Sequence, residues 1–395
     1  MGVRPFKSQW EASMASKKIE SGSAPRGRFA NRVPKQNLAT FFLSVTNQCN
    51  LACDYCSAGA GPQNHAMLDP ADAEDLVRHW ISGAIGDQLT LVFTGGEPLL
   101  WGYDSLARIC RICRDEAAAG NKNLTIGIQS NGLLLDEDFI SLCREYKIEP
   151  SFSLDGPPPI NDIHRNGGEI VVASLKKLKA KKIAFGIVSC LTKELAVKIE
   201  PALEWFRKQG FLKVRINFLG QPPPERTATQ LDPQLLFRVK KSIYDHLIKY
   251  GSTAVQERNV LRQVRKFDAT FHGRLVEIEH CELLQCGAGC NLACLNPDGF
   301  FSLCVEKGMS NALGRVGSLA ELAGARQEFW QGAGMWEMCQ NCAADSICDH
   351  GCAAYHLMDH AKFESECQAN RMFWKYLVLK RAPILVSERG EEYGR

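Results

Sequence analysis

Cysteine is the residue type that most clearly carries chemistry in this sequence. The 395-residue chain has 17 cysteines, and three of them, Cys49, Cys53 and Cys56, lie on a short segment that follows an apolar run typical of a β-strand. Three thiolates on one loop can hold three irons of a cubane cluster and leave the fourth iron open to an exogenous ligand. Zinc is the alternative, but structural zinc takes four protein ligands, and the sequence supplies no fourth one nearby.

A second set of cysteines lies in the C-terminal part of the chain. Four of them have the spacing Cys-x2-Cys-x5-Cys-x3-Cys, which arises by chance about once in a thousand such chains. Upstream, Asn-Pro-Asp-Gly at 296–299 predicts a hairpin turn that brings Cys286 and Cys304 toward each other on paired strands. A zinc ribbon is the alternative interpretation of the paired cysteines. The spaced set and the cysteine that follows it are Cys339, Cys342, Cys348, Cys352 and Cys367.

Six cysteines remain outside these patterns and the upstream Cys281. Cys110, Cys113 and Cys143 fall on apolar helix faces and Cys190 falls in a strand, where a buried thiol behaves as a small hydrophobic side chain. We therefore expect these four to be structural. The other two, Cys290 and Cys294, lie close in sequence to Cys286.

The elements that must position these cysteines follow a regular order. Apolar β-type runs alternate six times with helical segments, which predicts parallel βαβ units and an α/β fold that closes into a full or partial barrel. The runs read as apolar on both faces, as in strands covered by helices. Chemistry in such barrels lies at the carboxyl ends of the strands. The predicted units are a flexible N-terminal extension (1–38), the barrel (39–225), a helical linker (226–279), a small cysteine-rich domain with a β-hairpin (280–372) and a C-terminal tail (373–395).

The composition excludes several classes of protein. With 45% hydrophobic and 23% charged residues the chain has the composition of a globular protein, and no apolar run approaches the length of about 20 residues that a membrane span requires. The polar, basic N-terminal segment lacks the apolar core of an export signal, so we expect a cytoplasmic protein without a disulfide framework. The 47 basic residues are interspersed with 44 acidic ones, which gives no nucleic-acid signature.

The ordered motifs resemble the radical S-adenosylmethionine (SAM) superfamily, and the fold that this resemblance implies is a partial (β/α)6 barrel. The Cys-x3-Cys-x2-Cys loop after the first strand is that family's hallmark, and Thr94-Gly95-Gly96-Glu97-Pro98 resembles its GGE motif, which holds the amino group of SAM. Glycine is expected there because the backbone must approach the ligand closely. Turn chemistry is the alternative for Ser130-Asn131-Gly132 and Ser153-Leu154-Asp155-Gly156-Pro157. The resemblance implies SAM contacts from Tyr55, Gly95, Gly96, Glu97, Pro98, Ser130, Asn131, Ser153, Arg165 and Leu191, with Arg165 facing the SAM carboxylate.

The C-terminal cysteines resemble the SPASM extension of radical SAM enzymes, which holds two auxiliary 4Fe-4S clusters. The resemblance therefore implies SAM and three 4Fe-4S clusters in all. If Cys281 does not complete the first auxiliary cluster, that cluster keeps an open iron. The implied ligands are Cys286, Cys304, Cys352 and Cys281 for the first auxiliary cluster, and Cys339, Cys342, Cys348 and Cys367 for the second.

What the resemblance implies about function is an oxidative peptide maturase. SAM is cleaved to a 5′-deoxyadenosyl radical, a hydrogen is abstracted from a peptide side chain, and a carbon–carbon or thioether cross-link, such as a cyclophane, forms in a ribosomally made peptide. Sulfatase maturases, which make formylglycine from Cys or Ser of a protein, are the alternative, but they carry an Asp where Val305 follows Cys304 here. Many peptide maturases carry an N-terminal domain that binds the leader of the substrate peptide, and the 38 polar N-terminal residues here are expected to be too few to form one.

Two further expectations concern partners and proton transfer. The resemblance implies a reductant such as flavodoxin or ferredoxin. A third hypothesis for the function is a non-catalytic Fe-S electron carrier. Such a carrier predicts no SAM cleavage under reducing conditions. The candidate catalytic bases are Asp155, Glu306, Asp349 and His350.

Overall fold

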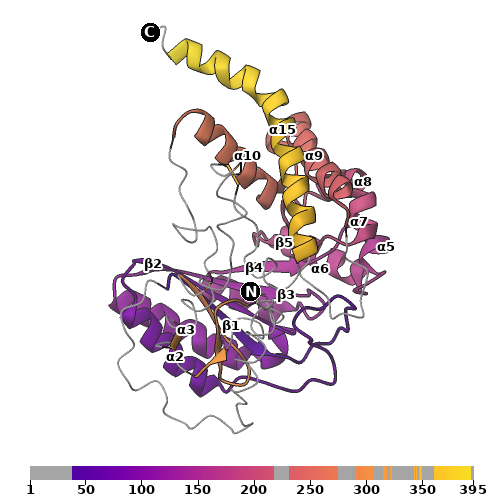
Figure 1. The fold of residues 1–395 in the computed structure, drawn as a ribbon. Coiled ribbons are helices and arrows are strands. Elements are labelled where there is room, and N and C mark those ends of the chain that lie inside the picture. Colours follow the sequence, from indigo (N-terminus) through magenta and orange to yellow (C-terminus); the bar gives the residue numbers. More distant parts are fainter. Residues whose placement is uncertain are drawn as a thin grey trace, which may run out of the picture.

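A computed structural model of the chain describes most of the barrel and parts of the C-terminal region (Figure 1). The described residues are 38–217, 231–274, 288, 291–305, 315–317, 321–322, 342, 344, 347–348 and 360–392.

A mixed sheet organises the described residues. Its strand order is β10-β9-β8-β1-β2-β3-β4-β5-β6-β7, and β1 to β6 are parallel neighbours in chain order, as the sequence predicts for a partial (β/α)6 barrel. The strands are β1 (Thr40–Thr46), β2 (Gln88–Gly95), β3 (Asn123–Ser130), β4 (Ile148–Ser153), β5 (Gly186–Cys190), β6 (Lys213–Asn217), β7 (Gln256–Glu257), β8 (Leu292–Leu295), β9 (Phe301–Ser302) and β10 (Arg315–Val316).

Helices connect consecutive strands and cover one face of the sheet (Figure 1). Several begin at a capping carboxylate: Asp69 accepts from Ala71 N (2.8 Å), and Asp136 accepts from Phe139 N (2.9 Å). The helices are α2 (Pro70–Gly83), η1 (Pro98–Trp101), α3 (Tyr103–Ala119), α4 (Glu137–Tyr146), α5 (Pro158–Asn161), α6 (Gly168–Ala180), α7 (Lys193–Val197), α8 (Ile199–Gln209), α9 (Pro233–Tyr250), η2 (Gly251–Thr253), α10 (Arg258–Phe271) and α15 (His360–Glu392).

The two faces of the barrel strands differ in polarity. Large apolar side chains such as Phe41, Phe93 and Phe152 are fully buried. The alternate positions on β3 and β4 carry polar side chains, among them Gln129 and Ser153, which are only partly buried. The expectation of strands that are apolar on both faces is therefore wrong for β3 and β4, because alternate side chains of a strand point to opposite faces and one of these faces carries polar groups.

The predicted hairpin turn is confirmed, while the approach of Cys286 to Cys304 stays a prediction because Cys286 lies outside the described residues. β8 and β9 are antiparallel, and the turn between them has Gly299 at φ +78° with Gly299 N donating to Asn296 O (2.9 Å). β8 also pairs in parallel with β1, so residues 292–295 extend the barrel sheet. The sequence pattern did not predict this pairing.

The C-terminal helix α15 crosses the boundary that the sequence suggested at residue 372. It packs against α9 and α10, where Phe373 contacts Tyr244 and Trp374 stacks on Phe267. An ion pair joins Arg381 to Asp268. The division into domains stays a prediction.

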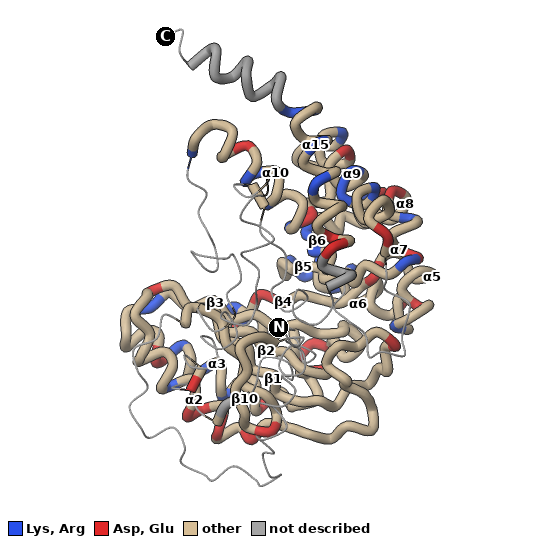
Figure 2. The backbone as a smooth tube through the Cα atoms, viewed as in Figure 1, with Lys and Arg blue, Asp and Glu red and all other residues tan. Residues whose placement is uncertain are grey.

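Charged residues of both signs are interspersed over α8, α9 and the described part of α15 (Figure 2). None of the described helices is both long enough and apolar enough to cross a membrane.

Candidate active site

The cysteine loop, residues 49–56, leaves β1 at the carboxyl ends of the parallel strands. Cys49 fixes its first turn: the backbone N–H donates to Gly61 O (3.2 Å), and Sγ accepts from Leu51 N (3.4 Å) and Asn131 Nδ2 (3.7 Å). Asn131 also donates to Asn50 Oδ1 (2.6 Å). Because Asn131 directly follows β3, the end of the third strand holds the start of the loop.

The loop thiols lie within electrostatic range of one another. Burial raises the pKa of Cys53 to about 11; the charge of Arg165 opposes this rise, and those of Cys56 and Cys49 add to it. Burial likewise raises the pKa of Cys49, despite its hydrogen bonds from Leu51 and Asn131. In the described part of the chain, no three His, Cys, Asp or Glu side chains converge as ligands of a single metal ion.

These thiols suit the iron–sulfur cluster that the sequence predicts. Thiolates are soft ligands that such clusters prefer. The N–H donors from Leu51 and Asn131 to Cys49 Sγ are of the kind that tune cluster potentials. Cys49, Cys53 and Cys56 would therefore hold the cluster.

Glu97 lies fully buried between the ends of β2 and β3. Its carboxylate accepts from Leu99 N (3.0 Å), Ser130 Oγ (3.0 Å) and Asn131 N (2.7 Å). Burial raises its pKa to about 7, although these hydrogen bonds lower it. The part of Glu97 in holding the SAM amino group stays a prediction.

We expect this carboxyl group to make stability fall as pH rises from about 4.5 to 7. Its folded pKa of about 7 exceeds the ordinary value of 4.5, so the folded state binds the extra proton in that window. At about 1.36 kcal/mol per pKa unit, the wild type should lose up to about 3 kcal/mol relative to Glu97→Gln across the window. Urea unfolding of both proteins from pH 4.5 to 7.5 measures this difference. A difference that is flat or of opposite sign would contradict it.

Gly95 and Gly96 allow two backbone segments to touch. A Cβ on Gly96 would lie 2.1 Å from Gln48 O, and one on Gly95, where φ is +127°, would lie 2.3 Å from Thr46 O. Gly96 N donates to Thr46 O (2.7 Å) and Glu97 N to Gln48 O (2.8 Å). The glycines are thus required by the strand that leads into the cysteine loop, which is a different reason from the approach to SAM inferred from the sequence.

Gly96→Ala should consequently displace the start of the cysteine loop. We expect a loss of about 1–3 kcal/mol in the free energy of unfolding, because the clash is with backbone, together with lower iron content after reconstitution. Gly83→Ala is the matched control, since a Cβ there meets nothing within 4 Å. Equal stability and equal iron content of the two variants would contradict this explanation.

Tyr55, Asp155 and Arg165 form a buried cluster beside the loop. Asp155 Oδ2 accepts from Tyr55 OH and from Arg165 Nε (3.4 Å), and Arg165 Nε also donates to Tyr55 OH (3.0 Å). Asp155 Oδ1 accepts from Cys190 N (2.7 Å). Burial and the charge of Asp155 raise the pKa of Tyr55, which keeps its hydroxyl protonated. Both oxygens of Asp155 are engaged, and these contacts favour a positioning role for it over that of a catalytic base.

The ends of β4 and β5 complete this edge. Ser153 Oγ accepts from Gln129 Nε2 (3.1 Å), and Leu191 is buried. Cys190 differs from its predicted role as a buried hydrophobic residue: it is only partly buried and lies close enough to Tyr55 and Arg165 for its charge to affect their pKa values. The structure thus gathers at one edge Cys49, Cys53, Tyr55, Cys56, Gly95, Gly96, Glu97, Pro98, Ser130, Asn131, Ser153, Asp155, Arg165 and Leu191.

His164 lies between two carboxylates. Its Nδ1 is 2.7 Å from Asp54 Oδ2, and its Nε2 is 2.8 Å from Glu194 Oε2. Burial lowers the pKa of His164, but the hydrogen bonds and charges of Asp54 and Glu194 outweigh this and raise it. The sequence pattern pointed to neither carboxylate, although Asp54 stands inside the cysteine motif.

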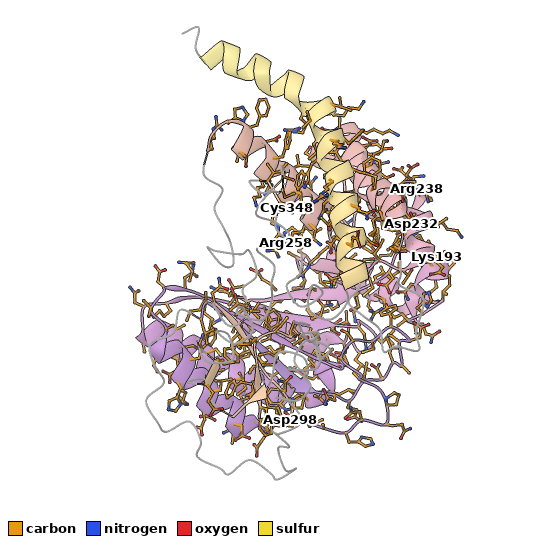
Figure 3. All side chains as sticks on the ribbon, viewed as in Figure 1. Lys193, Asp232, Arg238, Arg258, Asp298 and Cys348 are labelled. Atoms are coloured by element: carbon orange, nitrogen blue, oxygen red, sulfur yellow. The ribbon has the colours of Figure 1, made fainter. Side chains whose placement is uncertain are left out.

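The described C-terminal cysteines lie near α10 and α15, apart from Cys304 on the hairpin. Arg371 Nη2 donates to Cys342 Sγ (3.8 Å). Burial raises the pKa of Cys367; the charge of Arg371 opposes this rise, and that of Cys342 adds to it. Lys266 on α10 donates to Cys348 O (2.8 Å), and Figure 3 shows Cys348 beside α10 and far from Asp298 in the hairpin turn. Arg371 and Lys266 were not predicted. Outside the described residues lie Cys281, Cys286, Cys339, Cys352, Glu306, Asp349 and His350.

The predicted structural thiols on helices are confirmed as core residues. Cys110, Cys113 and Cys143 are buried, and burial raises their pKa values. Cys294 is also buried, in β8.

Known proteins share both the sequence pattern and the fold. Residues 43–211 match the radical SAM superfamily. An uncharacterized protein of Methanocaldococcus jannaschii is 31% identical over 183 residues, which are 45% of this chain and 61% of that protein. This chain therefore spans only about three fifths of that relative's length. A serine-type anaerobic sulfatase-maturating enzyme of Klebsiella aerogenes is 25% identical over 328 residues, 78% of this chain and 77% of the enzyme.

Two solved structures extend the similarity in fold beyond the barrel. The structure of anSMEcpe with bound AdoMet and Cp18Cys peptide has a TM-score of 0.73 at 19% identity, covering 89% of this chain and 99% of that one. Streptococcus suis SuiB bound to precursor peptide SuiA has a TM-score of 0.58 at 13% identity, covering 90% and 86%. At these identities the likeness concerns the fold alone. Together with the cysteine loop, the match over residues 43–211 shows that the chain carries a radical SAM domain.

Proposed function

We propose that this chain is an oxidative radical SAM maturase whose product is a carbon–carbon or thioether cross-link in a ribosomally made peptide. The observation that supports catalysis most directly is the attachment of the cysteine loop to the strand ends through Asn131 and through the cluster of Tyr55, Asp155 and Arg165. A loop held in this way keeps thiolates and SAM-binding groups at fixed positions relative to each other.

The cluster and SAM, when bound, supply one-electron cleavage of SAM and a 5′-deoxyadenosyl radical that abstracts a hydrogen from the peptide. The chain's own residues orient the reactants. Glu97 is proposed to accept from the SAM amino group, and Arg165 is proposed to donate to its carboxylate. In its described hydrogen bonds Arg165 donates from Nε. The planar guanidinium group of arginine has a geometry that suits a carboxylate.

Two auxiliary 4Fe-4S clusters in the C-terminal region are part of the proposal. Cys342 and Cys367, which share Arg371, and Cys348 would be ligands of one of them. Cys304, at the end of the hairpin, would be a ligand of the other. A cluster near the substrate can accept the electron that an oxidative product releases. We further propose a cytoplasmic location and an electron donor such as flavodoxin or ferredoxin, because reduced cysteines and low-potential electrons are both found there.

Formylglycine formation on a protein substrate is the second candidate. The relatives named sulfatase-maturating enzymes support it, and the absence of Asp directly after Cys304 argues against it. The fold is compatible with either reaction.

A product analysis separates these candidates. The reconstituted enzyme is incubated anaerobically with SAM, a reductant and either a short peptide encoded beside its gene or a sulfatase-derived Cys or Ser peptide. Cross-linking and oxidation of serine to formylglycine each remove two hydrogens, a loss of about 2 Da. Oxidation of cysteine to formylglycine also exchanges sulfur for oxygen, which gives a loss of about 18 Da. A hydrazide probe then labels the aldehyde of formylglycine but not a cross-link.

The outcomes are distinct. A loss of about 2 Da without hydrazide labelling supports the cross-link. Hydrazide-reactive product supports the second candidate instead. No formation of 5′-deoxyadenosine by a protein with full iron content would overturn both and leave an electron carrier.

A further inference from the structure

His164 holds together three segments that approach the site from different strands. The segment 154–165 lies between the cysteine loop and the β5–α7 turn. It contacts each of these two neighbours once in the interior and once at a more exposed position. On the cysteine-loop side, Arg165 contacts Tyr55 in the interior, and His164 contacts Asp54 outside it.

The other side repeats this arrangement. Asp155 accepts from Cys190 N in the interior, and His164 contacts Glu194 in the first turn of α7. His164 is therefore the shared member of both outer contacts. Its backbone adds a third, because His164 O accepts from Asp54 N (3.3 Å).

The geometry requires an imidazole ring. The side chain of His164 is 9% exposed, while those of Asp54 and Glu194 are 50% and 35% exposed, so a mostly covered ring bridges two more exposed carboxylates. Imidazolium places one N–H on each side of the ring and can donate to both. The side-chain amide of glutamine donates from one nitrogen and cannot span the same two partners.

We propose that His164 is a positioning residue that fixes Asp54, and with it Cys53 and Tyr55, relative to α7, so that the cysteine loop is preorganised to bind SAM. This inference rests on the proposed function and names a residue that acts through Asp54 without touching SAM. It distinguishes His164 from an ordinary surface ion pair, whose removal would leave the loop unchanged.

The test compares reconstituted wild type with His164→Gln, Asp54→Asn, Glu194→Gln and the double variant His164→Gln/Asp54→Asn. His79→Gln is the matched control, because His79 is a partly exposed histidine on α2 whose ring contacts only Asp75 O (2.6 Å) among its described hydrogen bonds. Two quantities are measured anaerobically: amide hydrogen exchange of residues 47–61, and the Kd of SAM from the change that it causes in the electron paramagnetic resonance spectrum of the reduced cluster.

We expect His164→Gln to accelerate exchange in the loop and to weaken SAM binding about tenfold, with an unchanged melting temperature. The double variant should be no worse than His164→Gln alone, because both changes remove the same contact. Glu194→Gln, which leaves the loop's own residues intact, should reproduce part of both effects.

Loop exchange and SAM affinity equal to those of His79→Gln would overturn the proposal, as would strictly additive effects in the double variant. A fall in melting temperature with unchanged SAM affinity would also overturn it, since that outcome describes a structural contact only. If SAM leaves the spectrum of the wild type unchanged, the proposed function fails, and the exchange of residues 47–61 still decides the role of His164.

Discussion

Replacing Cys49, Cys53 and Cys56 together by alanine is expected to abolish reductive cleavage of SAM. Without these thiolates nothing on the loop can hold a cluster, and about four irons per chain should be lost, the content of one cubane. The change is measured as 5′-deoxyadenosine formed under dithionite and as iron bound after anaerobic reconstitution. Because the loop is anchored by contacts from Asn50, Asp54 and Tyr55, we expect the barrel itself to stay folded.

Cys110→Ala is the control for loss of a thiol as such. Cys110 is buried in the core on α3, away from the strand ends, so this variant should keep both its iron and its activity. If the triple variant retained full iron content or cleaved SAM, the assignment of the loop would be wrong.

Asp155→Asn should be the most damaging single change at the strand ends. The side chains of Asp155 and Arg165 are 2% and 11% exposed, so the substitution leaves a buried guanidinium without its carboxylate partner. We expect a loss of about 3–5 kcal/mol in the free energy of unfolding. The KM for SAM should rise as well, because Arg165 and Tyr55 lose the group that aligns them. Urea unfolding and the dependence of 5′-deoxyadenosine formation on SAM concentration measure the two effects.

The matched control removes an exposed carboxylate. Glu137→Gln affects ion pairs with Lys177 and Lys181 at a side chain that is 58% exposed, and solvent screens such pairs, so stability should not change measurably. Should Asp155→Asn unfold like this control, the buried cluster would not be the organising element described above.

Much of the barrel was predictable because its signals are local. The alternation of apolar runs and helical segments predicted β1 to β6, and Asn-Pro-Asp-Gly predicted the hairpin turn. The pairing of β8 with β1 was not predictable in this way, since neighbouring strands far apart in sequence are chosen by the assembled edge and not by the strand's own residues. The polar positions on β3 and β4 were missed because Gln129 and Ser153 lie near the ends of otherwise largely apolar runs.

The same distinction between local signals and contacts between distant segments applies to the site. Motif residues such as Cys49, Glu97 and Arg165 could be named from spacing and resemblance, and the structure brings them to one edge. Glu194 and Cys190 could not, because their relevance depends on contacts with segments that lie about 30 residues or more away in the chain. The structural need for glycine at position 96 was not predictable for a similar reason: a Cβ there would meet Gln48 O, which follows another strand.

The pairing of β1 with β8 also has a consequence for biosynthesis. The strand that covers the outer edge of β1 is synthesised about 250 residues after β1, roughly 10–50 s later at 5–20 residues per second. During that interval a barrel with β1 to β6 in place would present an unpaired edge, a surface that recruits other strands and favours aggregation. Slow translation or truncation before residue 292 should therefore lower the soluble yield of this protein and increase its dependence on chaperones.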